Sequence, residues 1–203
     1  MNFFEFQYYF EENSIMFDLV RTKMPSNLVS LKKNEKCILS DEHLYFIEKG
    51  VLLLKQNFYK GKARHTLLLE PGFIQSKTTS SIVSIHSLEN TELLVFNIVD
   101  LFDQLEKEMI LSNFVWYLAK QINLEFQNTY KIIKSANKKS ILSILSYIKA
   151  SIPEADEKIM PSWVNVKLLS LLCSCSVASA KSNLKALEDE NIIQMKDGHI
   201  VMS

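Results

Sequence analysis

Glycine is scarce in this sequence. The 203 residues include four glycines, at Gly50, Gly61, Gly72 and Gly198. No two of them lie close enough to form the glycine-rich loop of a dinucleotide-binding motif or a phosphate-binding loop. Both familiar ways of holding nucleotide phosphates through backbone amides are therefore excluded.

Cysteine and long apolar runs are also sparse. The three cysteines, Cys37, Cys173 and Cys175, are too few for a disulfide framework, which favours a cytoplasmic, reducing location. No apolar run approaches the roughly 18 residues of a membrane span. The stretch from Met1 to Glu12 contains acids but no lysine or arginine. We therefore expect no signal peptide and no membrane partner.

Charge is balanced overall but placed unevenly. The chain has 23 basic and 23 acidic side chains, yet residues 126–153 and 158–187 contain lysines and no aspartate or glutamate. A polyanion binds where lysines gather without carboxylates, because each neutralised phosphate releases condensed counterions. The alternative explanation for such stretches is an ordinary solvated surface.

Short runs rich in Val, Ile, Leu and Phe dominate residues 27–99. Turn residues separate these runs at regular intervals, which predicts antiparallel strands in a sandwich or barrel. Gly50, Gly61 and the pair Pro71-Gly72 are expected in the turns. Residues 1–100 are therefore predicted to form a β domain preceded by a helical stretch. The expected strands are 36–40, 44–48, 51–56, 65–70, 82–88 and 92–98.

Residues 101–136 change to a helical period. Apolar residues recur there at spacings of three and four, which predicts one long helix with a continuous apolar stripe. Trp116 lies off this stripe, so we expect one apolar face to pack on the β domain and another on a second copy of the chain. A helix packed only within its own domain is the alternative. The expected dimer interface is Leu111, Val115, Leu118, Ile122 and Phe126.

Residues 137–203 are predicted to form a third unit. A helix should end near Pro153, Asn165 should cap a short helix, and Ser176 should cap a longer one that runs to about residue 190. Asp197-Gly198 lies between two apolar runs, which is a strong signal for a β-hairpin. Helix, turn, helix and hairpin is the order of a winged helix-turn-helix.

These segments resemble one family. The segment 164–176 resembles the paired-helix motif of the CRP/FNR bacterial transcription regulators, and 183–193 continues it without a gap. The segment 45–51 is similar to a strand-turn-strand of that family's β-roll. The resemblance implies an α+β fold with an N-terminal antiparallel β-roll (a cupin-like, cyclic-nucleotide-binding-domain fold), a long dimerisation helix and a C-terminal winged helix-turn-helix.

The implied function is a homodimeric, sequence-specific regulator that binds double-stranded DNA. A recognition helix needs one apolar face for its own domain, and Ala180, Leu184 and Leu187 have the spacing of such a face. Side chains elsewhere on this helix, at its start and around the hairpin are expected to meet DNA. These residues are Lys167, Ser176, Val177, Ala178, Ser179, Lys181, Ser182, Lys185, Lys196 and His199.

The sequence departs from the family in this helix. Family members commonly have Arg and Glu where this chain has Val177 and Ala178, and another Arg where it has Ser182. Bidentate reading of guanine is therefore not expected, and the small apolar pair favours contact with thymine methyl groups. The missing arginines also support an alternative hypothesis, in which the winged helix binds a protein partner rather than DNA.

The effector site departs as well. Gln75 and Ser76 stand where cyclic-nucleotide-binding relatives have Gly and Glu, and no arginine follows. We therefore expect that cyclic AMP is not the ligand and that any small-molecule effector is of another kind. With one cysteine in the first half, no iron–sulfur cluster is expected, and no cofactor is predicted.

Three further features leave alternatives open. Ser174 replaces the usual turn glycine, and a left-handed serine there would cost roughly 1–2 kcal/mol. Cys173 and Cys175 are either a redox switch or small residues in a turn. Three scattered histidines would make a metal-dependent cupin only by converging in the barrel, and no catalytic motif is present, so we expect no enzyme. They are His43, His65 and His86.

Overall fold

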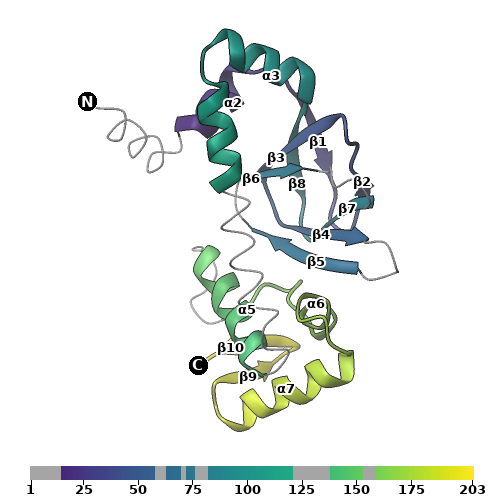
Figure 1. Ribbon diagram of the computed structural model, residues 1–203. Helices are drawn as coiled ribbons and strands as arrows, with labels where there is room; N and C mark the ends of the chain where they lie inside the picture. Colours follow the sequence, from purple (N-terminus) through teal and green to yellow (C-terminus); the bar gives the residue numbers. More distant parts are fainter. Residues whose placement is uncertain (1–14, 58–62, 70–71, 76–81, 121–137, 153–158) are drawn as a thin grey trace, which may run out of the picture.

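The computed structural model of the protein describes residues 15–57, 63–69, 72–75, 82–120, 138–152 and 159–203. Helices lie at one end, two β-sheets in the middle and a C-terminal helical domain with a small hairpin at the other end (Figure 1). Within these residues, no helix is both long and apolar enough to cross a bilayer.

Eight strands form two four-stranded antiparallel sheets, as predicted for the β domain. The first sheet has the order β1 (Asn27–Leu31), β8 (Thr91–Asn97), β3 (His43–Lys49) and β6 (Gly72–Gln75). The second has the order β2 (Lys36–Ile38), β7 (Ile82–Ser87), β4 (Leu52–Asn57) and β5 (Ala63–Leu68).

Two strands, β1 and β6, are absent from the predicted set. Four of the five residues of β1 are exposed, so this strand shows little of the alternation that sequence analysis looks for. Gly72 is predicted to lie in a turn, but it is the first residue of β6 and pairs with Ile47.

Three apolar clusters fill the spaces between the layers. The inner core lies between the two sheets. The helical core lies between the first sheet and the helices at residues 15–23, 98–107 and 111–120. The C-terminal core joins the second sheet to the C-terminal domain. Adjacent residues of β3 point to opposite faces of the sheet and belong to different clusters. Tyr45 belongs to the inner core and Phe46 to the helical core. In β4, Leu52 belongs to the inner core and Leu53 to the C-terminal core.

The helices on the first sheet differ from the predicted single helix over 101–136. Helix α2 (Ile15–Lys23) is followed, after the sheets, by α3 (Ile98–Lys107), which begins where the Asn97 side chain accepts hydrogen bonds from the backbone amides of Val99 and Asp100. The chain then turns at Met109, whose φ is 58°, and a new helix begins at residue 111. This helix is described as far as residue 120.

Three helices end in the same way without glycine. In each, a residue with positive φ follows the helix, and the next amide donates to a carbonyl five residues back. This is the Schellman motif, in which glycine usually takes the left-handed position and an apolar residue follows it. The left-handed residues are Met109, Ser174 and Asn191, and the apolar residues after them are Ile110, Cys175 and Ile192, each packed on a core.

The C-terminal domain contains the predicted elements in the predicted order. They are α5 (Lys138–Ser151), α6 (Val166–Leu172), α7 (Val177–Asp189), β9 (Ile193–Lys196) and β10 (His199–Met202). Both predicted caps are confirmed, because Asn165 Oδ1 accepts from the Leu168 amide at 3.0 Å and Ser176 Oγ accepts from the Ser179 amide at 3.0 Å.

The hairpin turn is of the predicted kind. Asp197 and Gly198 have φ values of 51° and 81°, and β9 and β10 pair antiparallel on either side of them. Positive φ at both central residues is the mark of a type I′ turn, which matches the twist of the strands it joins.

Gly50 occupies a crowded corner between β3 and β4. Its φ is 105°, and a Cβ atom there would lie 2.5 Å from Thr91 Oγ1 and 2.7 Å from the Asn90 carbonyl oxygen. Both the backbone conformation and the close approach exclude a side chain.

Substituting Gly50 and Gly198 by alanine, one at a time, separates the effect of backbone strain from that of close packing. We expect Gly50→Ala to lower the free energy of unfolding by about 3 kcal/mol, because left-handed strain and overpacking add. Gly198 has φ 81°, but a Cβ atom added to it would meet no other atom within 4 Å. Gly198→Ala should therefore cost only about 1 kcal/mol, the strain alone. Urea unfolding followed by circular dichroism measures both, and equal losses would contradict the packing argument.

Candidate nucleic-acid interface

Helix α7 has one buried face and one free face. Ala180, Leu184 and Leu187 are buried as predicted, with 0%, 5% and 0% exposure. Apart from the half-buried Asn183 and Ala186, the remaining side chains of the helix are exposed, and the helix lies at the end of the molecule far from the β domain (Figure 1). The described residues on this exposed side are Val177, Ala178, Lys181, Ser182 and Lys185.

The start of α7 has the features of an anion-facing helix end. Its first turn contains no acid, and the hydroxyls of Ser176 and Ser179 lie 2.9 Å apart beside the first amides. Both residues are exposed. The partial positive charge of a helix N-terminus favours phosphate at such a position.

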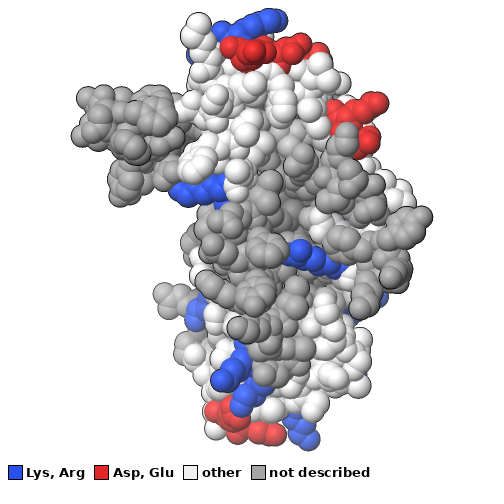
Figure 2. Space-filling model, in the orientation of Figure 1, with Lys and Arg blue, Asp and Glu red and all other residues white. Residues whose placement is uncertain are grey.

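The hairpin adds two basic or ionisable side chains. Lys196 and His199 pair across β9 and β10, with Lys196 exposed and His199 half-buried. Three acids of this region, Glu188, Asp189 and Glu190, are at the opposite end of α7 from its N-terminus, and Glu190 forms an ion pair with Lys138. A fourth acid, Asp197, is exposed in the hairpin turn between Lys196 and His199. On the face drawn in Figure 2, Lys and Arg side chains are dispersed over the C-terminal half of the molecule.

Lys167 stands apart from the other predicted DNA contacts. It lies on α6 and is exposed, but its charge contributes, after burial and Lys36, to lowering the pKa of His86 on β7. The ammonium group is therefore close to the β domain. The structure brings the remaining predicted residues together on α7, at its N-terminus and on the hairpin.

The helix that begins at residue 111 divides its apolar residues between two sides. Leu111 and Leu118 are partly buried against the helical core, whereas Val115 is 48% exposed and its neighbour Trp116 is 57% exposed. The other two residues of the predicted dimer interface, Ile122 and Phe126, lie outside the described residues.

Sequence analysis missed the main anchor of this helix. Phe114 is fully buried and its ring meets that of Phe73 edge-on, with centroids 5.2 Å apart. Its spacing of three from Leu111 and four from Leu118 is the signal that identifies the face turned toward the β domain.

The predicted effector region is only partly described. Gln75 ends β6, and residues 76–81 lie outside the described part of the chain. Between the sheets, the inner core is packed with apolar side chains. Sequence analysis overlooked Arg64. It lies four residues before Leu68 on β5, so both side chains are on the inner face of this strand. The Nε atom of Arg64 is buried and has no hydrogen-bond partner among the described residues. A guanidinium is suited to binding carboxylate or phosphate.

The cysteines and histidines support the simpler explanations. Burial, with a smaller contribution from Cys175, raises the pKa of the Cys173 thiol to about 11, so its reactive thiolate is disfavoured. His43 lies on the first sheet, whereas His65 and His86 lie on the second. Among the described residues, no three His, Cys, Asp or Glu side chains are grouped to hold a metal ion.

Both histidines of the second sheet have lowered pKa values. Burial lowers the pKa of His65, and the charge of Lys55 adds to the effect. Burial also lowers the pKa of His86, with further contributions from Lys36 and Lys167. Both imidazoles are therefore held in their neutral form more strongly than in the unfolded chain.

Comparisons with known proteins show the fold. No protein-family model and no curated protein matches the sequence. Among solved structures, FixK2 from Bradyrhizobium japonicum matches with a TM-score of 0.70 at 12% identity, covering 88% of this chain and 93% of that chain. The c-di-GMP-responsive global regulator CLP from Xanthomonas campestris matches with a TM-score of 0.68 at 14% identity, covering 87% and 93%.

A third match is a CRP/FNR-family transcriptional regulator from Thermus thermophilus. Its TM-score is 0.64 at 14% identity, and the alignment covers 87% of this chain and 93% of that chain. The chain therefore has a CRP/FNR-like fold, as the sequence resemblance predicts.

The turn between α6 and α7 provides a stability test. Ser174 is exposed and has φ 51°, so the left-handed conformation considered above is present. We expect Ser174→Gly to raise the free energy of unfolding by about 1 kcal/mol, because glycine adopts this conformation without strain. Ser174→Ala keeps the strain and should give no gain. Chemical unfolding of the three proteins tests this, and a loss of stability in Ser174→Gly would contradict it.

The two lowered histidine pKa values predict sensitivity to acid. As pH falls from about 6.5 to about 5, the unfolded chain takes up protons at these sites before the folded protein does, so stability falls. Over this pH range, the melting temperature of the double variant His65→Gln/His86→Gln should fall less than that of the unsubstituted protein. His43→Gln, on the other sheet, serves as the matched control. An identical acid response in parent and double variant would refute the assignment.

Proposed function

We propose that the protein is a sequence-specific DNA-binding transcription regulator that acts as a homodimer, with residues 137–203 forming a winged helix-turn-helix domain. The observation that carries this proposal is helix α7, whose exposed side is small and basic while its opposite side is fully buried. A recognition helix needs both faces in order to enter the major groove while it stays attached to its domain. The CRP/FNR-like fold supports the same function.

Base contacts would come from the first two turns of α7. Val177 is 45% exposed, and with Ala178 it offers small apolar groups to thymine methyls. Lys181, Ser182 and Lys185 follow on the exposed side and can reach bases or phosphates. This chemistry favours A·T-rich half-sites over the guanine contacts that arginine makes.

Phosphate contacts would surround the recognition helix. Ser176 and Ser179 sit at its N-terminus, and Lys196 and His199 flank the hairpin turn, where the neighbouring DNA backbone would pass. Lys167 is assigned a weaker phosphate contact, since its ammonium also lies close to the β domain. These groups fix the register of the protein on DNA without reading its sequence.

The dimer would form along the helix that begins at residue 111. Val115 and Trp116 leave an apolar side of this helix exposed, while Leu111 and Leu118 also contact the β domain. The proposed interface remains Leu111, Val115, Leu118, Ile122 and Phe126. Two copies of α7 would then meet half-sites one helical turn apart, roughly 34–36 Å.

We assign the β domain to sensing or to support of the dimer. Any effector would be a small molecule other than cyclic AMP, and the proposed regulator is a cytoplasmic protein that uses no cofactor and catalyses no reaction. Gln75, in place of the glycine that cyclic-nucleotide-binding relatives use, supports the exclusion of cyclic AMP.

Charge reversal on α7 tests DNA binding. In gel shifts with genomic fragments, Lys181→Glu/Lys185→Glu should weaken specific binding at least about 100-fold at low salt, because each lysine pairs with the phosphate backbone. The slope of log affinity against log salt should fall by about one for each lysine lost, or about four for a dimer.

The matched control reverses two lysines far from α7. Lys32→Glu/Lys33→Glu makes the same charge change on exposed residues between β1 and β2 and should bind DNA like the parent. Equal losses in both double variants would show a general charge effect instead. Parent affinity that neither exceeds nonspecific binding nor depends on salt would refute the proposed function and leave a protein-binding role for the C-terminal domain.

A further inference from the structure

The C-terminal core crosses the boundary between the β domain and the C-terminal domain. Residues from the outer face of the second sheet belong to the same buried cluster as those of α5, α6 and α7. The β-domain members are 5% to 9% exposed, so the two domains bury an apolar surface against each other. These members are Val51, Leu53, Leu67, Leu69 and Leu88.

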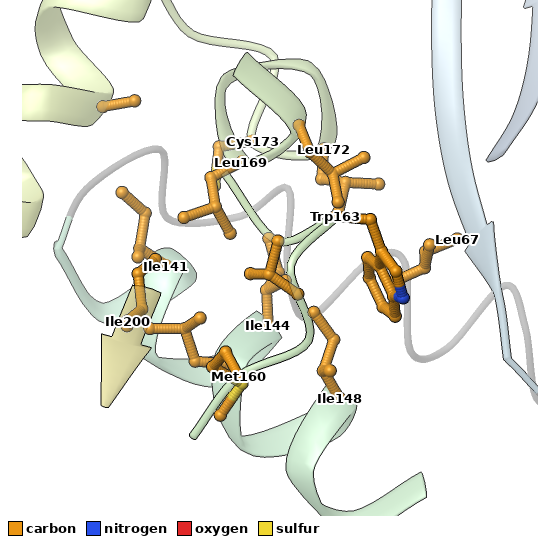
Figure 3. Packing of buried hydrophobic residues seen from close by; sticks show 14 of the residues in the cluster. Leu67, Ile141, Ile144, Ile148, Met160, Trp163, Leu169, Leu172, Cys173 and Ile200 are labelled. Carbon is orange, nitrogen blue, oxygen red and sulfur yellow. The ribbon is translucent and has the colours of Figure 1, made fainter. Parts of the chain in front are cut away.

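Trp163 lies at the centre of this boundary. It is 6% exposed, and Figure 3 shows its ring between Leu67 of β5 and Ile148 of α5. The indole Nε1 donates a hydrogen bond to Glu89 Oε1 at 2.6 Å. A hydrogen bond to an ionised carboxylate is stronger and more directional than one between neutral groups, so this contact adds orientation to apolar packing.

Glu89 belongs to a rigid corner of the β domain. Its backbone carbonyl accepts hydrogen bonds from the hydroxyls of Ser87 and Thr91, which are 0% and 1% exposed and lie 2.8 Å apart. The Asn34 amide donates to the Ser87 carbonyl at 2.8 Å, and Gly50 presses against Thr91 with no room for a side chain. The corner therefore holds the Glu89 backbone in place, and the carboxylate extends from it to the Trp163 indole.

Trp163 is connected to the proposed DNA-binding helices by a hydrogen bond and by the core that they share. The Trp163 carbonyl accepts a hydrogen bond from Asn165 Nδ2 at 3.2 Å, and Asn165 is the N-cap of α6. Buried residues of α6 and α7, Leu169 and Leu184 among them, belong to the same core as Trp163. Lys167, on the first turn of α6, also lies near His86 of β7. A shift of Trp163 would therefore shift α6 and α7 together.

We propose that the Glu89–Trp163 hydrogen bond seats the C-terminal domain on the second sheet and thereby sets the orientation of helix α7 for DNA. Glu89 and Trp163 are then positioning residues that touch no DNA themselves. The inference rests on the proposed function, and it adds that contact between the two domains favours DNA binding. The exposed side of α7 stays uncovered in the seated arrangement, so seating favours DNA binding instead of blocking it.

The expected effect follows from the geometry of a dimer. Both copies of α7 must enter successive major grooves at once, and a domain that has lost its fixed orientation meets this spacing less often. Loss of the hydrogen bond should weaken specific binding about tenfold, the change that corresponds to 1.4 kcal/mol. Nonspecific binding and its salt dependence should stay unchanged, because the lysines remain.

The fluorescence measurements use the full chain with Trp116→Phe as the parent, which leaves Trp163 as the only tryptophan. The gel shifts use the same substitutions in the full chain with Trp116 retained, because Trp116 lies beside the proposed dimer interface. Five variants are compared: Glu89→Ala, Trp163→Phe and the double variant of the two remove the hydrogen bond, Glu89→Gln keeps an acceptor, and Glu92→Ala is the control. Glu92 is an exposed carboxylate three residues further along the chain. Trp163→Phe keeps an aromatic ring in the core and covers the case in which Glu89→Ala fails to fold.

Two measurements separate seating from DNA binding. Acrylamide should quench Trp163 fluorescence more in Glu89→Ala than in the parent, with Glu89→Gln in between and Glu92→Ala unchanged. Gel shifts should show the tenfold loss in Glu89→Ala and Trp163→Phe. The double variant should lose no more than either single variant, because both remove the same bond.

Each contrary result has one meaning. Unchanged quenching in Glu89→Ala, together with unchanged DNA affinity in Glu89→Ala and Trp163→Phe, would overturn the inference, as would additive losses in the double variant. Tighter DNA binding in these variants would overturn it too, because seating would then oppose binding. If the unsubstituted chain shows no specific DNA binding, the proposed function fails, while the quenching series still reports whether the hydrogen bond seats the domain.

Discussion

Burial on both faces of the central strands β3 and β4 is the constraint on which this molecule is built. β3 places Tyr45 in the inner core and Phe46 in the helical core, and β4 divides Leu52 and Leu53 between the inner and C-terminal cores in the same way. A strand with two buried faces is apolar throughout, which explains why these segments lack the alternation of a surface strand. The helices at one end and the C-terminal domain at the other are therefore parts of one packed stack.

The same stack explains why the contact between domains is directional. An apolar surface alone permits sliding, because the hydrophobic effect depends on buried area more than on angle. The hydrogen bond between Trp163 and the carboxylate of Glu89, whose backbone lies in the corner formed by Gly50 and Thr91, fixes one point on that surface. Through Trp163 this point is coupled to the helix pair whose exposed side carries the proposed DNA contacts.

Three of the described helices end in a left-handed residue that is not glycine. Schellman motifs at Met109, Ser174 and Asn191 use residues that accept left-handed strain, and each is followed by an apolar residue packed on a core. The packing of these following residues offsets the strain. The absence of the usual glycine also hides the ends from sequence analysis, which is why the break after α3 at Met109 is missing from the prediction of one continuous helix.

Local chemistry determined much of this protein from the sequence alone. The caps at Asn165 and Ser176, the Asp197-Gly198 hairpin and the buried face of α7 follow from interactions between near neighbours, so the pattern of residues was sufficient. Tertiary structure alone decided the place of Lys167 beside the β domain and the meeting of Glu89 with Trp163. These depend on segments more than 70 residues apart packing together, and no local pattern encodes which distant surface buries which side chain.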